Sequence, residues 1–302
     1  MLQWSVYFQN PEFLERSRLE LVVPDYAPLI YKWCGVKDDS KILDVACGSG
    51  FFSRFLKHAG PNVSVTGFDL DENFISSAKV FAERENLDID FVMGDARSLP
   101  FDDASFDVVA SHTFFTSAPE PEKVLAEMKR VLRPGGRVAS ITGMSVNWPE
   151  TMRYGNYPPG CFVAWAKDFF VLSAKLEAAY DKINPRSEYV SELKPSAIPN
   201  FFATHGLKNV CAYPLGKVFS FSNAATPIEI KKRWLELYET SELKKLETFM
   251  KLQEMKEFFT EEDAERFREL LRMKCEYYRA NPNENEIWEM NGYTNILVTG
   301  DI

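Results

Sequence analysis

The sequence predicts a doubly wound α/β fold, in which helices cover both faces of a mostly parallel sheet. First, short apolar runs alternate with helical patterns from residue 41 to residue 142. Second, the turn Gly48-Ser49-Gly50 joins the first apolar run to the first helical pattern. Third, aspartates stand at the ends of successive apolar runs. Alternating strands and helices are typical of βαβ units and a parallel sheet, whose ligands bind at the carboxyl ends of the strands.

The predicted elements follow one another in a regular order. We expect strands at 41–46, 63–70, 89–96, 106–115 and 137–143, and helices at 51–59, 73–86 and 121–132. Pro134-Gly135-Gly136 closes the last of these helices. Later residues predict a helix at 196–206, a strand at 208–216, two or three helices within 226–280 and an alternating strand at 292–302. The last strand therefore joins the sheet after a long helical insertion.

Two insertions interrupt this pattern, and we expect both to form lids. The expected divisions are an N-terminal helical cap at 1–40, a ligand-binding core at 41–145, an aromatic insertion at 146–195, a core helix and strand at 196–222, a helical insertion at 223–287 and a final core strand at 288–302. Within the helical insertion, Thr226 with Glu229 predicts a capping box, and Thr260 with Asp263 is a second helix start signal.

Composition limits the classes of protein and partner. Apolar residues make up 45% of the 302 residues and charged residues 26%, which is typical of a soluble globular protein. The net charge of -9 argues against a nucleic-acid partner, because binding to phosphates depends on Lys and Arg. The five cysteines are scattered and form no C-x-x-C pair, which favours reduced thiols over disulfides or a zinc site.

The same reading leads to an expected location in the cytoplasm. The N-terminal residues lack the apolar segment of a signal peptide, and no run reaches the roughly 18 apolar residues of a membrane span. We therefore expect no membrane partner. No constellation of metal ligands stands out, so we also expect a metal-independent reaction. The sequence leaves the oligomeric state open.

The glycine turn suits two classes of cofactor. Dinucleotide binding favours G-x-G-x-x-G, and here Gly48 and Gly50 supply two glycines while Ser53 stands at the third position. Asp69 ends the second predicted strand, where a carboxylate can accept hydrogen bonds from both ribose hydroxyls. Asp95 ends the third strand and can accept from the exocyclic amine of adenine. These acids frame an adenosine and suit a positively charged sulfonium. A nicotinamide oxidoreductase is the weakest alternative, because it requires Ser53 to replace the third glycine.

The residues Asp44 to Gly50, Asp69, Gly94-Asp95-Ala96, "FDVVASHTFF" and "EMKRVLRPGGRV" together resemble the class I S-adenosylmethionine-dependent methyltransferases, in the methyltransferase 11 or UbiE-like group. The resemblance covers residues 40–142 and the final strand. It implies a Rossmann-like sheet of seven strands with an antiparallel last strand. It also implies S-adenosylmethionine as cofactor and S-adenosylhomocysteine as product. Ala46 departs from the family, which usually has glycine there.

The resemblance implies cofactor contacts for residues in the loops after the predicted strands and at the N-terminus: Asp44, Ala46, Gly48, Gly50, Asp69, Leu70, Asp95, Ala96, Ser111 and Tyr7. Backbone of the glycine turn would approach the methionine part of the cofactor, and Asp44 would orient that turn. Asp69 would hold the ribose, and Asp95 would accept from the adenine edge. Leu70 would cover one face of the adenine.

His112, at the end of the fourth predicted strand, is a candidate general base. An alcohol or phenol acceptor needs such a base, whereas an amine or thiolate can react through alignment alone. The alternative is a structural role, in which His112 packs against the cofactor or in the core.

The expected function is methyl transfer to an oxygen, nitrogen or sulfur atom of a small molecule in an aromatic, lidded pocket. Aromatic residues of both insertions are candidates for its lining: Trp148, Tyr154, Tyr157, Phe162, Trp165, Phe169, Trp234, Tyr238, Tyr277 and Tyr278. A protein or RNA methyltransferase, or a protein that binds the cofactor without transfer, are the alternatives, because a fold alone does not fix a function.

Overall fold

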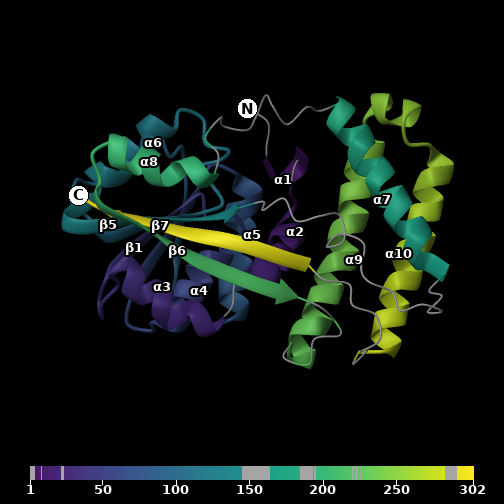
Figure 1. Cartoon of the computed structure of the whole chain (residues 1–302), viewed down its shortest axis with the longest axis horizontal. Helices are drawn as coiled ribbons and strands as arrows, with labels where there is room; N and C mark the ends of the chain where they lie inside the picture. Colours follow the sequence, from purple (N-terminus) through teal and green to yellow (C-terminus); the bar gives the residue numbers. More distant parts are fainter. Residues whose placement is uncertain are drawn as a thin grey trace. The chain divides into compact units, whose positions relative to one another are not determined.

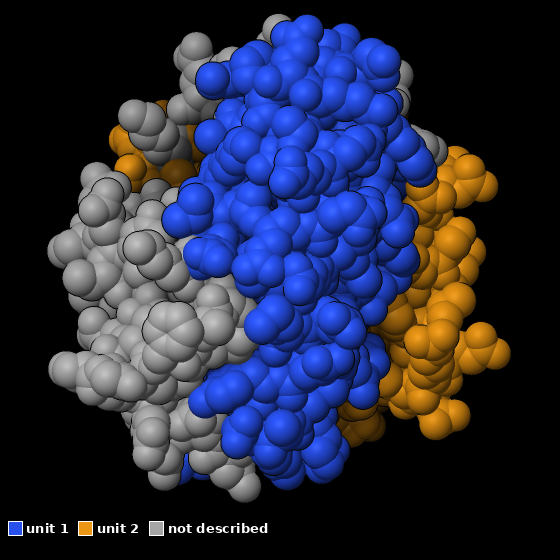
Figure 2. Space-filling model, turned by 90° about the vertical axis from the view of Figure 1, so that its right-hand side faces the viewer, with its two compact units in different colours: residues 1–20, 147–188, 218–292 blue, residues 21–146, 189–217, 293–302 orange. Residues whose placement is uncertain are grey.

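The computed structural model describes residues 4–7, 9–21, 24–144, 164–183, 193, 195–219, 221, 224, 226–282 and 291–302 (Figure 1). The chain divides into two compact units (Figure 2). Unit 1 comprises residues 1–20, 147–188 and 218–292, and unit 2 comprises residues 21–146, 189–217 and 293–302. The segment 1–40, expected as one cap, is divided between the two units after residue 20.

Unit 2 is built on a seven-stranded sheet in the order β3-β2-β1-β4-β5-β7-β6. The strands are β1 (Lys41–Val45), β2 (Ser64–Asp69), β3 (Asp90–Met93), β4 (Phe106–His112), β5 (Leu132–Met144), β6 (Lys208–Phe219) and β7 (Asn291–Asp301). Strands β1 to β5 are parallel, and β7 is antiparallel to β5. The expected doubly wound sheet with an antiparallel last strand is confirmed.

Helices cover both faces of this sheet, as Figure 1 shows. They are α3 (Ala27–Cys34), α4 (Phe51–Ala59), α5 (Glu72–Arg84), α6 (Pro121–Arg130) and α8 (Ile198–Thr204). Successive residues of a strand point to opposite faces. Leu43 and Val109 therefore pack in the cluster that contains α6 and α8, whereas Ile42 and Val108 pack in the cluster that contains α3 and α4. Both faces are buried, which explains the continuous apolar runs.

The connection from α6 to β5 differs from the expected one. The helix ends at Arg130 and the strand begins at Leu132, before Pro134-Gly135-Gly136. Pairing with β4 then jumps from Leu132 to Arg137, so the intervening residues form a large bulge within the strand. Gly135 has a φ of 79°, which an L residue adopts only at a cost.

Apart from the ends of β6 and β7, the described elements of unit 1 are helices. Its elements are α1 (Trp4–Tyr7), α2 (Pro11–Leu21), α7 (Ala164–Ile183), α9 (Ile228–Met250), a 3-10 turn at Gln253–Glu257 and α10 (Glu261–Ala280). Helices α7, α9 and α10 share one apolar core, which includes Phe169, Trp234 and Phe267. Helix α7, over residues 164–183, was not expected from the sequence.

Of the two helix start signals expected in unit 1, the one at α10 is confirmed and the one at α9 is wrong. Thr260 and Asp263 form the expected reciprocal capping box at α10. At α9 the expected capping box is absent, because Pro227 is the N-cap residue and makes no side-chain cap hydrogen bond. Thr226 therefore lies one residue outside the position from which its hydroxyl would cap.

Candidate functional site

The carboxyl ends of β3, β2, β1 and β4 lie next to one another and gather the predicted site residues. The register pairs Val45 at the end of β1 with Phe68 on one side and with Ser111 on the other. Asp69 at the end of β2 is paired with Met93 at the end of β3. The turn after each strand therefore opens at the same edge of the sheet.

The turn after β1 has three residues in the left-handed region. The φ angles are 59° at Ala46, 55° at Gly48 and 76° at Gly50. Gly50 is also crowded, because a Cβ there would lie 2.9 Å from the Cβ of Ala78 and from the ring of Phe91. A glycine turn in this conformation lets a ligand approach the backbone closely. At Ala46 the left-handed conformation costs more free energy than at a glycine, because of the methyl group.

Asp44 is fully buried beneath this turn. Its Oδ2 accepts a hydrogen bond from the Ser53 hydroxyl at 2.6 Å, and Ser53 is fully buried in α4. Ser53 stands where a dinucleotide-binding turn has its third glycine. In this chain that position supports the carboxylate instead of permitting closer packing of helix on strand. Ser53, a mismatch to the dinucleotide-binding pattern, thus holds Asp44 in place beneath the turn.

Asp69 connects the ends of two strands and the start of a helix. Its Oδ2 accepts from the backbone N–H of Gly48 at 2.8 Å, and its Oδ1 accepts from the N–H of Asp71 at 2.9 Å. Burial raises the pKa of Asp69 to about 6, although these backbone hydrogen bonds act in the opposite direction. Each oxygen retains capacity to accept a second hydrogen bond, as a ribose hydroxyl would require.

Two apolar side chains stand exposed beside Asp69. Leu70 is 49% exposed and Met93 is 56% exposed, at the ends of adjacent strands. Exposed apolar side chains at a strand-end edge are suited to covering a flat heterocycle. Leu70 was expected in that role. Met93 was missed, although the sequence "FVMGD" places it two residues before Asp95.

Asp95 is held by Arg97, which was not among the predicted site residues. Arg97 donates from Nη2 to Oδ2 of Asp95 at 2.6 Å and from Nε to Oδ1 at 3.0 Å, and its Nη1 donates to Glu120 at 2.7 Å. These hydrogen bonds hold the pKa of Asp95 below its usual range. The carboxylate is therefore ionised at neutral pH and oriented by Arg97. Neighbouring Ala96 is half-buried.

Ser111 and His112 end β4, and both are buried. Ser111 is fully buried, and its hydroxyl lies 3.4 Å from that of Ser140 on β5. His112 is 5% exposed, and its ring stacks on Phe52 of α4 with centroids 5.6 Å apart. The imidazole is thus placed between the sheet end and the first turn of the helix that follows the glycine turn.

The side chains of Tyr7 and of five of the ten expected pocket aromatics lie outside the described residues. The backbone of Tyr7 belongs to α1 of unit 1, and its side chain lies outside the described residues. The same holds for the side chains of Trp148, Tyr154, Tyr157, Phe162 and Trp165.

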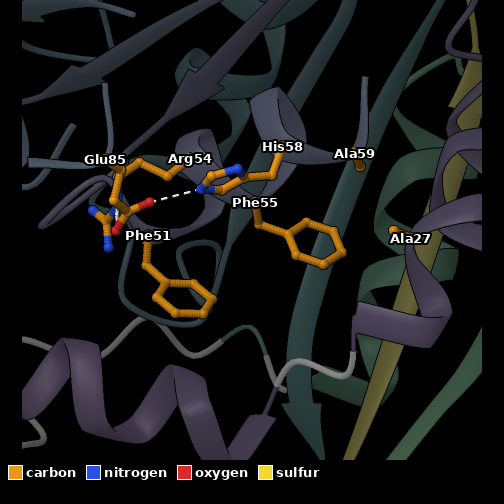
Figure 3. A pocket seen from close by; sticks show the side chains of 7 residues that line it. All are labelled: Ala27, Phe51, Arg54, Phe55, His58, Ala59 and Glu85. Carbon is orange, nitrogen blue, oxygen red and sulfur yellow. Dashed lines mark hydrogen bonds and ion pairs between the residues drawn. The ribbon is translucent and has the colours of Figure 1, made fainter. Parts of the chain in front are cut away.

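A pocket of about 520 Å³ opens on the outer face of α4 (Figure 3). Its lining comprises Ala27, Phe51, Arg54, Phe55, His58, Ala59 and Glu85. Glu85 accepts from Arg54 at 3.0 Å and pairs with the His58 ring at 2.8 Å, next to the two phenylalanine rings. No predicted cofactor residue is in this lining. Helix α4 therefore presents aromatic rings on two faces, with Phe52 turned toward His112.

The described residues contain neither a candidate metal site nor a candidate membrane span. No group of three or more His, Cys, Asp or Glu side chains in those ranges could hold a metal ion. Within the same ranges, every helix is too short or too polar to cross a bilayer.

Comparisons with known proteins identify the domain that carries this site. Residues 43–140 match the family described as "Methyltransferase domain". The chain is 35% identical over 136 residues to sterol 24-C-methyltransferase ERG6B of Gibberella zeae, a match of 44% of this chain and 35% of that protein. It is 41% identical over 114 residues to demethylmenaquinone methyltransferase of Staphylococcus aureus, covering 37% of this chain and 46% of that protein.

A solved structure extends the likeness of fold to almost the whole chain. Phosphoethanolamine N-methyltransferase 2 of Haemonchus contortus superposes with a TM-score of 0.50 at 17% identity, covering 99% of this chain and 59% of that one. This likeness shows the fold alone. The matched segment spans less than half of the length of the two curated relatives. The segment 43–140, which matches the methyltransferase domain family, contains the turn after β1, Asp69, Asp95 and His112.

Proposed function

We propose that this protein transfers a methyl group from S-adenosylmethionine to a small-molecule acceptor. One observation carries the proposal: the ends of four adjacent strands gather the left-handed turn, two oriented carboxylates and a buried imidazole. The cofactor supplies an electrophilic methyl group on a positively charged sulfur. Everything else in the reaction is binding, alignment and, for some acceptors, proton removal.

The residues at this edge fit an adenosine. Asp69 would accept from the ribose hydroxyls, since its raised pKa of about 6 still leaves it mostly ionised at pH 7. Asp95 would accept from the adenine amine while Arg97 keeps it oriented. Leu70 and Met93 would cover the ring, which removes apolar surface from water. Backbone at Ala46, Gly48 and Gly50, with Asp44 beneath it, would surround the methionine part.

The chemical step would depend mainly on alignment. An in-line displacement needs the acceptor atom, the methyl carbon and the sulfur on one line, and such positioning contributes on the order of 7–11 kcal/mol. For an alcohol or phenol acceptor, His112 would take the hydroxyl proton as the carbon–oxygen bond forms and the carbon–sulfur bond breaks. For an amine or thiolate acceptor, the ring would serve only in packing on Phe52.

A small molecule is the preferred class of acceptor. The named relatives are a sterol and a demethylmenaquinone methyltransferase, and both names describe small acceptors. The net charge of -9 disfavours RNA. We also propose that the two insertions take part in acceptor binding, since both interrupt the regular strand-and-helix pattern of the sequence. The four described cysteines are free, which agrees with a cytoplasmic protein.

Transfer of labelled methyl from S-adenosylmethionine into a cell extract tests this proposal. The extract is fractionated after reaction into small molecules, protein and nucleic acid. Label in the small-molecule fraction is the expected result. Label in protein or RNA would replace the proposed acceptor class with a macromolecule. Tight S-adenosylhomocysteine binding with no transfer into any fraction would contradict an enzymatic role.

A further inference from the structure

The turn after β1 has a glycine on each side of Ser49. Gly48 and Gly50 both have left-handed φ angles, and glycine has the widest choice of backbone conformations of any residue. The peptide planes of such a turn can rotate at little cost unless contacts hold them. The N–H of Gly48 donates to Asp69 at 2.8 Å, and the N–H of Gly50 donates to the Cys47 carbonyl at 2.9 Å. Neither of these two contacts holds the carbonyl of Ser49.

Arg54 of α4 holds that carbonyl. Its Nη1 donates to the Ser49 oxygen at 2.8 Å, and its backbone N–H donates to the Gly50 oxygen at 2.9 Å. The C=O of Ser49 and the N–H of Gly50 belong to one planar trans peptide and point in opposite directions. Fixing the carbonyl therefore fixes the direction of that N–H. One residue thus restrains two successive peptide groups of the turn.

The Arg54 side chain is itself buried and oriented. It is 4% exposed, and its Nε donates to Oε1 of Glu85 at 3.0 Å. Its guanidinium carbon lies 5.8 Å from the ring centroid of Phe51 and 5.2 Å from that of Phe81. A guanidinium presents its donors in a fixed planar fork, so these neighbours set the direction in which Nη1 points. Glu85, the C-cap residue of α5, is therefore coupled to the turn through Arg54.

Arg54 reaches the turn from the outer face of α4. Arg54 and Glu85 line the pocket on that face, and no predicted cofactor residue is in the lining (Figure 3). An effect of Arg54 on the cofactor would therefore pass through the Ser49 carbonyl and the backbone of the turn.

We propose that Arg54, oriented by Glu85, is a positioning residue that keeps the glycine turn in the conformation that binds the methionine part of S-adenosylmethionine. This inference rests on the proposed function for the identity and place of the cofactor. It predicts a selective effect. Asp69 and Asp95, on the loops after β2 and β3, would hold the ribose and the adenine. Loss of Arg54 should therefore weaken binding of the amino-acid end of the cofactor and spare the adenosine.

The test uses two ligands that differ only at that end. S-adenosylhomocysteine carries the amino acid, whereas methylthioadenosine has the same adenosine and thioether without it. Calorimetry compares both ligands on the full chain of wild type and Arg54→Met. In Arg54→Met the affinity for S-adenosylhomocysteine should fall about tenfold or more, because a hydrogen bond from a charged donor no longer orders the turn. The affinity for methylthioadenosine should change by less than about twofold.

Arg84→Met is the matched control. Arg84 is exposed, and its guanidinium carbon lies 5.8 Å from the centroid of the same Phe81 ring that Arg54 contacts. Both affinities should be unchanged in this variant. A selective loss in Arg84→Met equal to that in Arg54→Met would overturn the proposal, because the effect would then come from charge or from the Phe81 contact.

Two conservative variants test the fork geometry. Arg54→Lys keeps the charge but cannot donate to Ser49 and Glu85 from one planar fork, so it should resemble Arg54→Met. Glu85→Gln keeps an acceptor for Nε but loses the charge, so it should show a smaller loss with the same selectivity. Wild-type affinity for S-adenosylhomocysteine in Arg54→Lys would mean that the charge alone matters and would overturn the positioning role.

The two ligands also separate this inference from the proposed function. If Arg54→Met loses affinity equally for both ligands, then Arg54 supports the fold in general and the inference is wrong. If it loses affinity for neither, the inference is wrong as well. In both cases binding to wild type leaves the proposed function standing. If wild type binds neither ligand, the proposed cofactor site is wrong, and the role of Arg54 is refuted with it.

Discussion

The backbone N–H of Gly48 donates a hydrogen bond to the Asp69 carboxylate, with 2.8 Å between N and Oδ2. A side chain at the end of β2 therefore fixes the turn that follows β1. The other oxygen of Asp69 holds the N–H of Asp71, the N-cap residue of α5. The residue proposed to hold the ribose is thus also the one that sets the shape of the surrounding loops.

The two roles of Asp69 predict a pH-dependent affinity for the cofactor. Burial raises the pKa of Asp69 to about 6, and only the ionised carboxylate accepts freely from ribose hydroxyls. The affinity of wild type for S-adenosylhomocysteine should fall below about pH 6, by up to about tenfold per pH unit. Asp69→Asn should bind more weakly and without this step. Titration calorimetry from pH 8 to pH 5 checks it, and a flat wild-type profile would rule it out.

The raised pKa of Asp69 affects the stability of the cofactor-free protein in the opposite direction: stability decreases as the pH rises. The raised folded-state pKa means that the folded state binds the proton more tightly than the unfolded state does. The contribution of Asp69 to stability is therefore fully present below the ordinary pKa of 3.8 and is lost as the pH rises through about 6.

Gly50 and Gly135 form a matched pair for separating crowding from backbone strain. Their φ angles are 76° and 79°, but a Cβ at Gly50 meets Ala78 and Phe91 at 2.9 Å, whereas a Cβ at Gly135 meets nothing within 4 Å. Gly135→Ala should cost about 1–2 kcal/mol from strain. Gly50→Ala should cost about 1–3 kcal/mol more, because backbone or core must shift. Urea unfolding measures both, and equal losses would contradict the packing of α5 against the turn.

Ala46 is a position where a substitution should stabilise the protein. Its φ of 59° costs an alanine about 1–2 kcal/mol, whereas glycine adopts it freely. Glycine also makes the unfolded chain more flexible, which offsets about 0.4–1 kcal/mol. Ala46→Gly should therefore raise the free energy of unfolding by about 0.5–1 kcal/mol. An unchanged or lower value in the same urea experiment would mean that the methyl group makes compensating contacts.

The role of His112 depends on the acceptor atom. With an alcohol or phenol acceptor, His112→Ala should abolish transfer while S-adenosylhomocysteine still binds. His112→Phe, which keeps a ring against Phe52, separates proton removal from packing. If His112→Phe transfers methyl at the wild-type rate, then His112 does not remove the proton and only packs against Phe52. Single-turnover rates and calorimetry on both variants provide the comparison.

Local pattern was sufficient to predict the core of unit 2. Helix α4 runs over residues 51–59 as expected, because the glycine turn and Gly60 delimit it. The strands at Asp69 and before Asp95 were expected because each aspartate follows a short apolar run. The number of strands and the antiparallel last strand follow from the resemblance.

Other features depend on contacts between distant parts of the chain and were not predictable. In the sequence, Ser53 is only a mismatch to the dinucleotide-binding pattern. The structure shows that its hydroxyl donates a hydrogen bond to Asp44. Arg97 lies two residues after Asp95, but its second partner, Glu120, is brought close only by the fold.

The most direct test of the proposed site is equilibrium binding of S-adenosylhomocysteine to wild type and Asp69→Ala at pH 7.5, measured by calorimetry. Loss of two ribose hydrogen bonds to a charged group should weaken binding about 100-fold or more. Far-UV circular dichroism of Asp69→Ala serves as the control for folding. If wild type does not bind, or if a folded Asp69→Ala binds equally well, then the cofactor does not lie at the ends of β1 and β2.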